Sequence, residues 1–122
     1  MKRDLDLIRL LLLEIEKREE AFSSEDLTVN GYDSKKISYH IGLLRDAKFL
    51  DVSSEKQLPN GFKTYTIWAI TFSGHDYLDA VRQSKIWQLV KDTAKQAGAS
   101  LTVELAKGLA VQIASQLLGL AA

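Results

Sequence analysis

The chain has 122 residues, with 16 basic and 16 acidic side chains, so its formal net charge is zero. This length suits one buried core and is short for a catalytic domain with its own substrate pocket. The balanced charge weakens a nucleic-acid-binding interpretation without excluding it, and the lack of cysteine excludes disulfides and thiolate metal sites and favours a cytoplasmic protein.

The first predicted element is an amphipathic helix over residues 4–20. Leu5, Ile8, Leu12 and Ile15 recur at helical spacing on one face, and acidic residues in the first turn suit the positive end of the helix dipole. Charged residues interrupt the leucine run, so the segment is not expected to act as a signal peptide.

The connection that follows, residues 23–32, leaves two structures open. Leu27 to Val29 could form a short strand, or Ser23 or Ser24 could cap a single helical turn. Of the two, we expect the strand.

A second helix is predicted over residues 34–48, with Asp33 as its cap. Its apolar side carries Ile37, His40, Ile41, Leu44 and Ala47. Its polar side carries Lys35, Ser38, Tyr39, Gly42, Arg45 and Asp46. His40 is expected to pack at the edge of the apolar side and to hydrogen-bond a neighbouring backbone carbonyl.

A β-hairpin and three further helices complete the chain. Two β-prone runs flank Pro59-Asn60-Gly61, a strong turn signal because glycine accepts positive φ and proline presets its own. Ser73 with Asp76 resembles a capping box and predicts a helix directly after the hairpin. Beyond residue 84, apolar residues recur every four positions until Gly98, and Ser100 is expected to cap the last helix.

This order of elements is that of a winged-helix domain, with residues 34–48 in the recognition-helix position. The sequence therefore predicts an α+β chain. A winged-helix-like domain over residues 1–83 carries the β-hairpin as its wing, and a C-terminal helical hairpin over residues 84–122 serves oligomerisation.

Three sequence motifs resemble those of a known family. The stretches YHIGLL at 39–44 and TFSGHDYLDAVR at 71–82, together with Trp87, resemble an uncharacterised winged-helix-like family found in bacteria and their phages. The likeness spans most of residues 1–95 and includes the charged MKRD start. It implies the fold and a phage or prophage setting, and it supplies no catalytic or ligand residues.

The polar side of the second helix is the candidate nucleic-acid surface, because its side chains could reach base edges and phosphates in a major groove. Glycine inside a helix costs about 0.5–1 kcal/mol relative to alanine, which is tolerable where a partner approaches the backbone closely. A neutral glycine and a merely solvated helix face remain alternatives. The predicted binding residues, two hairpin lysines included, are Lys35, Ser38, Tyr39, Gly42, Arg45, Lys56 and Lys63.

No pattern in the sequence indicates catalysis. His40 and His75 are the only histidines, and neither stands at the spacing of a metal-binding motif. A phosphate-binding glycine loop and a nucleophile elbow are also absent from the sequence. We therefore expect a protein that is not an enzyme and that needs no metal or cofactor.

The last helix has an apolar stripe that predicts self-association. The alternative is that this stripe folds back onto the first or the third predicted helix of the same chain. The uncharged stretch from Gly108 to Ala122 is shorter than the ~20 residues that cross a bilayer, so no membrane span is expected. The predicted oligomer interface comprises Leu105, Leu109, Ile113, Leu117, Ala106 and Ala110.

The sequence favours a dimeric winged-helix protein that binds double-stranded DNA as a transcriptional or phage accessory factor. The alternative is a protein-interaction module on the same scaffold, without nucleic-acid binding. Salt separates the two, because counterion release makes affinity for nucleic acid fall steeply as salt rises.

Overall fold

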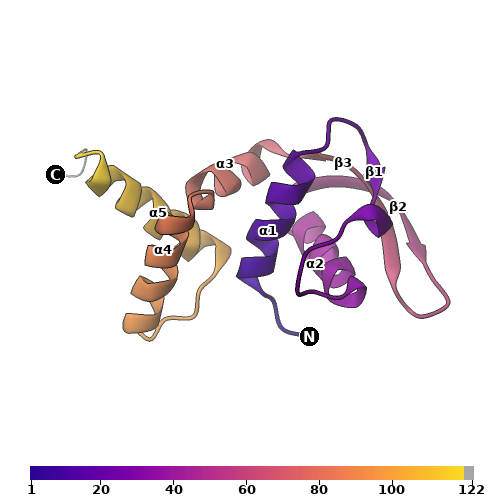
Figure 1. Ribbon diagram of the computed structural model, residues 1–122, viewed down its shortest axis with the longest axis horizontal. Coiled ribbons are helices and arrows are strands. Elements are labelled where there is room, and N and C mark those ends of the chain that lie inside the picture. Colours follow the sequence, from indigo (N-terminus) through magenta and orange to yellow (C-terminus); the bar gives the residue numbers. More distant parts are fainter. Residues whose placement is uncertain (120–122) are drawn as a thin grey trace. The chain divides into compact units, whose positions relative to one another are not determined.

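Five α-helices and a three-stranded antiparallel sheet make up residues 1–119, the part of the chain that this computed structural model describes (Figure 1). The side chains of residues 54 and 55 are not part of this description. The predicted α+β class is confirmed. The chain divides into two compact units within helix α3, Phe72–Val81. Unit 1 is Met1–His75, and unit 2 begins at Asp76. The sequence-based boundary lies after residue 83.

Helix α1, Leu5–Glu16, is capped by Asp4, whose side chain accepts a hydrogen bond from the Leu7 N–H. It ends before the predicted residue 20. The run from Lys17 to Glu20 offers no apolar side chain to the core, and two adjacent glutamates suit the negative end of a helix dipole poorly. The buried apolar side comprises Leu5, Leu7, Ile8, Leu11, Leu12 and Ile15.

The segment after α1 contains strand β1, Phe22–Ser23, and a 3-10 turn, η1, Ser24–Asp26. The helical-turn alternative is confirmed, because the Ser23 side chain accepts a hydrogen bond from the Glu25 N–H. The strand predicted at Leu27 to Val29 is wrong. Phe22 and Ser23 take the place beside β3, so residues 27–29 have no strand there with which to form backbone hydrogen bonds.

Helix α2, Ser34–Asp46, is capped by Asp33 as predicted, at 2.8 Å from the Lys36 N–H to the carboxylate. It ends two residues early because Lys48 adopts a left-handed conformation with φ of 62°, which closes the helix. Ala47 therefore lies outside the helix and is exposed. The other predicted apolar residues are buried: Ile37, His40, Ile41 and Leu44.

The predicted β-hairpin is confirmed by β2, Leu50–Gln57, and β3, Lys63–Ile70, which pair antiparallel. Gly61 has a φ of +85° in the turn, a conformation that glycine adopts without strain. The sheet order is β1-β3-β2. Both α1 and α2 pack against β3 and against each other (Figure 1).

Helix α3, Phe72–Val81, follows the hairpin directly, but its cap is Thr71 and not Ser73. The Thr71 hydroxyl accepts a hydrogen bond from the Gly74 N–H at 3.1 Å and donates one to the Lys48 carbonyl at 2.6 Å. Thr71 is thereby anchored on both sides, whereas Ser73 lies within the first turn and is exposed.

Unit 2 contains α4, Ser84–Gln96, and α5, Val103–Leu117, which pack against each other as the predicted helical hairpin. Gly98 ends the first helix pattern with a φ of +67°. The cap of the last helix is Thr102 and not Ser100, because the connection continues to residue 102 before helical geometry begins. Across residues 1–119, no helix is both long enough and apolar enough to span a membrane.

Candidate nucleic-acid interface

A cleft of about 320 Å³ opens in unit 1 between the polar side of α2 and the beginning of β3. We call it the α2–β3 cleft. Lys56 is on β2 and is not among its lining residues. The other six predicted binding residues all line it: Lys35, Ser38, Tyr39, Gly42, Arg45 and Lys63.

The position of β3 against α2 gives the cleft its shape. The Ser38 hydroxyl donates a hydrogen bond of 2.7 Å to the Lys63 carbonyl and so joins the two elements. The predicted outward position of Gly42 is wrong, because Gly42 is buried. A Cβ atom there would lie 3.0 Å from the Tyr65 hydroxyl oxygen. The close approach that glycine allows is therefore made by Tyr65 of the same chain.

The charged side chains of the cleft differ in the contacts that they make. Arg45 pairs with the Asp46 carboxylate at 3.2 Å, and its guanidinium carbon lies 5.5 Å from the Tyr65 ring centroid. Lys35 is exposed and makes no ion pair with the described side chains. With Lys63 included, three cationic side chains and one carboxylate line the cleft, so its side chains carry a surplus of two positive charges. This surplus is small for a surface that binds phosphates.

Aromatic rings also line the cleft. Tyr39 is 42% exposed, and its ring packs edge-on against the His40 ring, with 5.5 Å between the two ring centroids. Phe62 and Tyr65 line the cleft too, although neither was predicted from the sequence. A signal was available for Tyr65, because residues two apart on a strand share a face and Lys63 was already assigned to the site.

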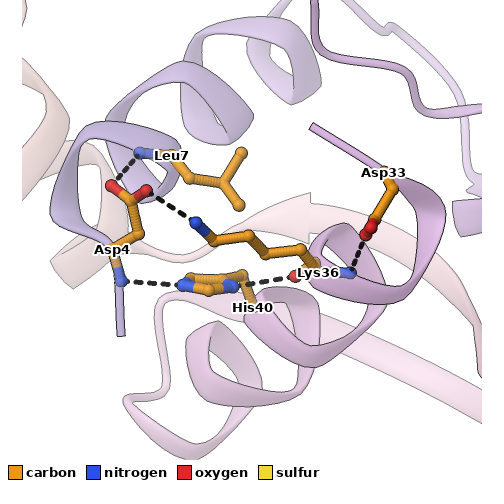
Figure 2. A network of polar contacts seen from close by, with 5 residues as sticks. All are labelled: Asp4, Leu7, Asp33, Lys36 and His40. Carbon is orange, nitrogen blue, oxygen red and sulfur yellow. Dashed lines mark hydrogen bonds and ion pairs between the residues drawn. The ribbon is translucent and has the colours of Figure 1, made fainter. Parts of the chain in front are cut away.

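A network of polar contacts fixes the first half of α2 (Figure 2). His40 is fully buried, and its Nδ1 lies 2.8 Å from the Lys36 carbonyl, which confirms the predicted packing and hydrogen bond. Its Nε2 accepts a hydrogen bond from the Asp4 N–H at 2.8 Å. These contacts require a neutral ring protonated on Nδ1. Burial lowers the pKa of His40 and favours this neutral form.

Asp4 links the same network to α1. Burial alone would raise the pKa of Asp4, but hydrogen bonds from the Leu7 N–H and from Lys36 lower it below its ordinary value. The Lys36 ammonium lies 3.1 Å from the carboxylate (Figure 2). One carboxylate therefore caps α1 and pairs with α2, which holds the cleft-forming helix in place.

The described residues hold no group of three or more histidine, aspartate or glutamate side chains placed to bind a metal ion. His40 is engaged on both ring nitrogens by backbone groups. The side chains that line the α2–β3 cleft can recognise a ligand by charge, hydrogen bonds and ring contacts.

The predicted oligomer residues divide into two sets on α5. Ala106 and Ala110 are completely buried within the chain. Leu105, Leu109 and Ile113 are half-buried, and Leu117 is 60% exposed. The two alanines are thus enclosed by the chain itself. The other four residues, which we call the leucine row, are still accessible.

Comparisons with known proteins identify a family and a relative of similar length. It matches the family described as "Hypothetical protein (DUF2513)" over residues 2–100. It is also 34% identical over 121 residues to a protein of Haemophilus influenzae described as "Uncharacterized protein", and the match covers 97% of this chain and 99% of that one. No solved structure matches the chain. The family match includes α2 and β3 and ends before α5 begins.

Proposed function

This chain belongs to the DUF2513 family of hypothetical proteins, and we propose that it binds DNA through the α2–β3 cleft of a winged-helix-like unit 1. In this proposal α2 is the recognition helix and the β2–β3 hairpin is the wing. The protein is a cytoplasmic transcriptional or phage accessory factor, is not an enzyme, and acts as a dimer.

One observation carries this proposal. Residues from two separate parts of the sequence, α2 and the beginning of β3, line the same cleft with cationic and hydroxyl side chains. Lysine and arginine can neutralise phosphates, and hydroxyl and guanidinium groups can hydrogen-bond base edges. Lys56 lies outside the cleft on β2, where the proposal assigns it to the flanking phosphate backbone.

The test is a fluorescence-anisotropy titration of the full chain against a labelled mixed-sequence duplex at about 50 mM and about 200 mM salt. Replacing Lys35 and Arg45 by alanine should weaken binding at low salt and reduce the slope of log affinity against log salt by about two, one for each lost phosphate contact. Exposed Lys85 and Lys107 of unit 2 provide a control, because their double alanine variant has the same net charge.

If the wild-type chain does not bind the duplex even at low salt, the DNA proposal is wrong and the protein-interaction alternative takes its place. Equal losses in the Lys35/Arg45 and Lys85/Lys107 variants would show binding governed by net charge alone. That result would remove the cleft from the proposal.

Dimerisation is assigned to the leucine row of α5, because an accessible apolar stripe is stabilised when a second copy covers it. Replacing Ile113 and Leu117 by lysine should reduce the mass measured by light scattering to that of a single chain. The matched control places lysines at Gln112 and Gln116, which are exposed polar positions on the same helix, and should leave the mass unchanged. A wild-type chain that is monomeric over a wide concentration range would contradict this assignment.

A further inference from the structure

Unit 1 contains a second groove, of about 210 Å³, which lies between the end of α1 and the last residues of β3. None of its lining residues lines the α2–β3 cleft. The pairing of β1 with β3 reaches only to Phe22, opposite Ile67, and the groove continues along β3 past this point to Ile70. The groove therefore follows an extended stretch of strand. We call it the β3 groove.

The groove exposes an aromatic side chain that a folded chain would normally cover. Trp68 is 57% exposed, and large exposed aromatics are typical of interaction surfaces. β3 carries a bulge here, because Asp51 pairs with Ala69 and Val52 pairs with Ile67, which leaves Trp68 as the extra residue. The Trp68 indole N–H donates a hydrogen bond to the Ser53 hydroxyl. Bulges direct side chains to new positions, often at functional sites.

The charge of the β3 groove is opposite to that of the α2–β3 cleft. Glu16, Glu19 and Glu20 line it, and Arg18 is the only lysine or arginine among the lining residues. The Arg18 guanidinium is already engaged, because it donates to the Asp26 carbonyl at 3.2 Å and lies 4.3 Å from the Phe22 ring centroid. The groove thus combines an acidic border with apolar and aromatic surface, a combination that repels phosphates and attracts cations.

We propose that the β3 groove binds an extended peptide segment of a protein partner that carries lysine or arginine. A cationic side chain over the Trp68 ring would make the same kind of contact that Arg18 makes with Phe22. Glu19 and Glu20 would pair with cations along the peptide, and apolar residues between them would contact half-buried Phe22 and exposed Ala69. This surface is additional to the DNA-binding function and does not depend on it.

The test uses the full chain and a fluorescein-labelled peptide of alternating lysine and valine, with a second peptide in which glutamate replaces lysine. Anisotropy should show saturable binding of the lysine peptide only, and the tryptophan emission should change because Trp68 is contacted. Trp68→Ala and the double variant Glu19→Gln/Glu20→Gln should each weaken binding about tenfold, equivalent to about 1.4 kcal/mol. These residues are on the surface, so circular dichroism should show unchanged folding.

The control is the Lys35→Ala/Arg45→Ala variant, whose substitutions lie in the other cleft and should leave peptide affinity unchanged. Binding that is insensitive to Trp68→Ala, or to loss of both glutamates, would overturn the proposal. Failure to bind the lysine peptide at millimolar concentration would also overturn it. Either result would leave the DNA proposal untouched, because the two titrations use different ligands and different variants.

Discussion

Gly74→Ala is expected to lower the free energy of unfolding by about 2–3 kcal/mol, because the added methyl group overlaps with backbone. A Cβ atom at this position would lie 2.4 Å from the Phe49 carbonyl oxygen and 2.7 Å from the Ile70 Cγ2. The carbonyl cannot move away freely, since it accepts the 2.9 Å hydrogen bond from the Thr71 N–H that joins β3 to the start of β2. Urea denaturation followed by circular dichroism measures the loss.

Two other helical glycines serve as controls for this prediction. A Cβ atom added at Gly108, in α5, would meet no atom within 4 Å, so Gly108→Ala should stabilise the chain by about 0.5–1 kcal/mol through helix propensity. A Cβ atom at Gly42 would meet only the end of the Tyr65 side chain, with 3.0 Å to the hydroxyl oxygen, so Gly42→Ala should have an intermediate effect. Equal changes at Gly74 and Gly108 would show that the Phe49 carbonyl does not restrict α3.

His40→Ala is expected to cost about 3 kcal/mol of unfolding free energy near pH 7.5, since it removes a buried ring and leaves buried polar groups without their partner. The ring joins Lys36 of α2 to Asp4 at the start of α1 through two hydrogen bonds of 2.8 Å (Figure 2). The same urea titration measures this loss. If His40→Ala lowers the free energy of unfolding by no more than the substitution of an exposed residue does, the two helices are held together without the imidazole.

The stability of the wild-type chain should also depend on pH through His40. Burial lowers the pKa of His40 below its ordinary value of 6.5, so the unfolded chain binds the proton more readily than the folded one. The contribution of neutral His40 to the free energy of unfolding is complete above about pH 6.5. It declines as the pH falls below that value, by at most about 1.4 kcal/mol per pH unit. Asp4 has a lowered pKa, and its contribution is lost at a lower pH, below the ordinary value of 3.8.

Comparison of wild type and His40→Ala between pH 7.5 and pH 5 isolates this effect, and the stability difference between them should narrow as the pH falls. A constant difference across the window would contradict a lowered pKa for His40.

The elements that the sequence predicted well are those with local signals. Asp33 precedes an apolar pattern at helical spacing, and Asn60-Gly61 sits between two β-prone runs, so both are recognisable within a few residues. The predictions that Ser73 and Ser100 cap their helices were wrong. Thr71 and Thr102, each two residues away, have equally suitable hydroxyls and are the caps. Thr71 is selected by its bond to Lys48, which is 23 positions away in sequence and leaves no local signal.

The candidate site was predictable as far as it depends on one helix face. Lys35, Ser38, Tyr39 and Arg45 follow from the periodicity of α2. Lys63 was predicted as a hairpin residue, and the structure places it in the same cleft as the α2 residues. The burial of Gly42 could not be predicted, because it depends on where Tyr65 lies once β3 has packed on α2. The β3 groove was also missed. It combines Glu19 and Glu20 with a bulge at Trp68, and pairing register is not visible in a single sequence.

The eight residues of β2 form one edge of the sheet, and this position has a consequence for colloidal behaviour. An edge strand can template the addition of another chain and so begin fibril growth. Here Asp51 and Lys56 place charges along the strand, and two register shifts against β3 interrupt its regularity. Replacing both charges by valine should therefore shorten the lag time for thioflavin-positive aggregates, even if the folded chain loses no stability.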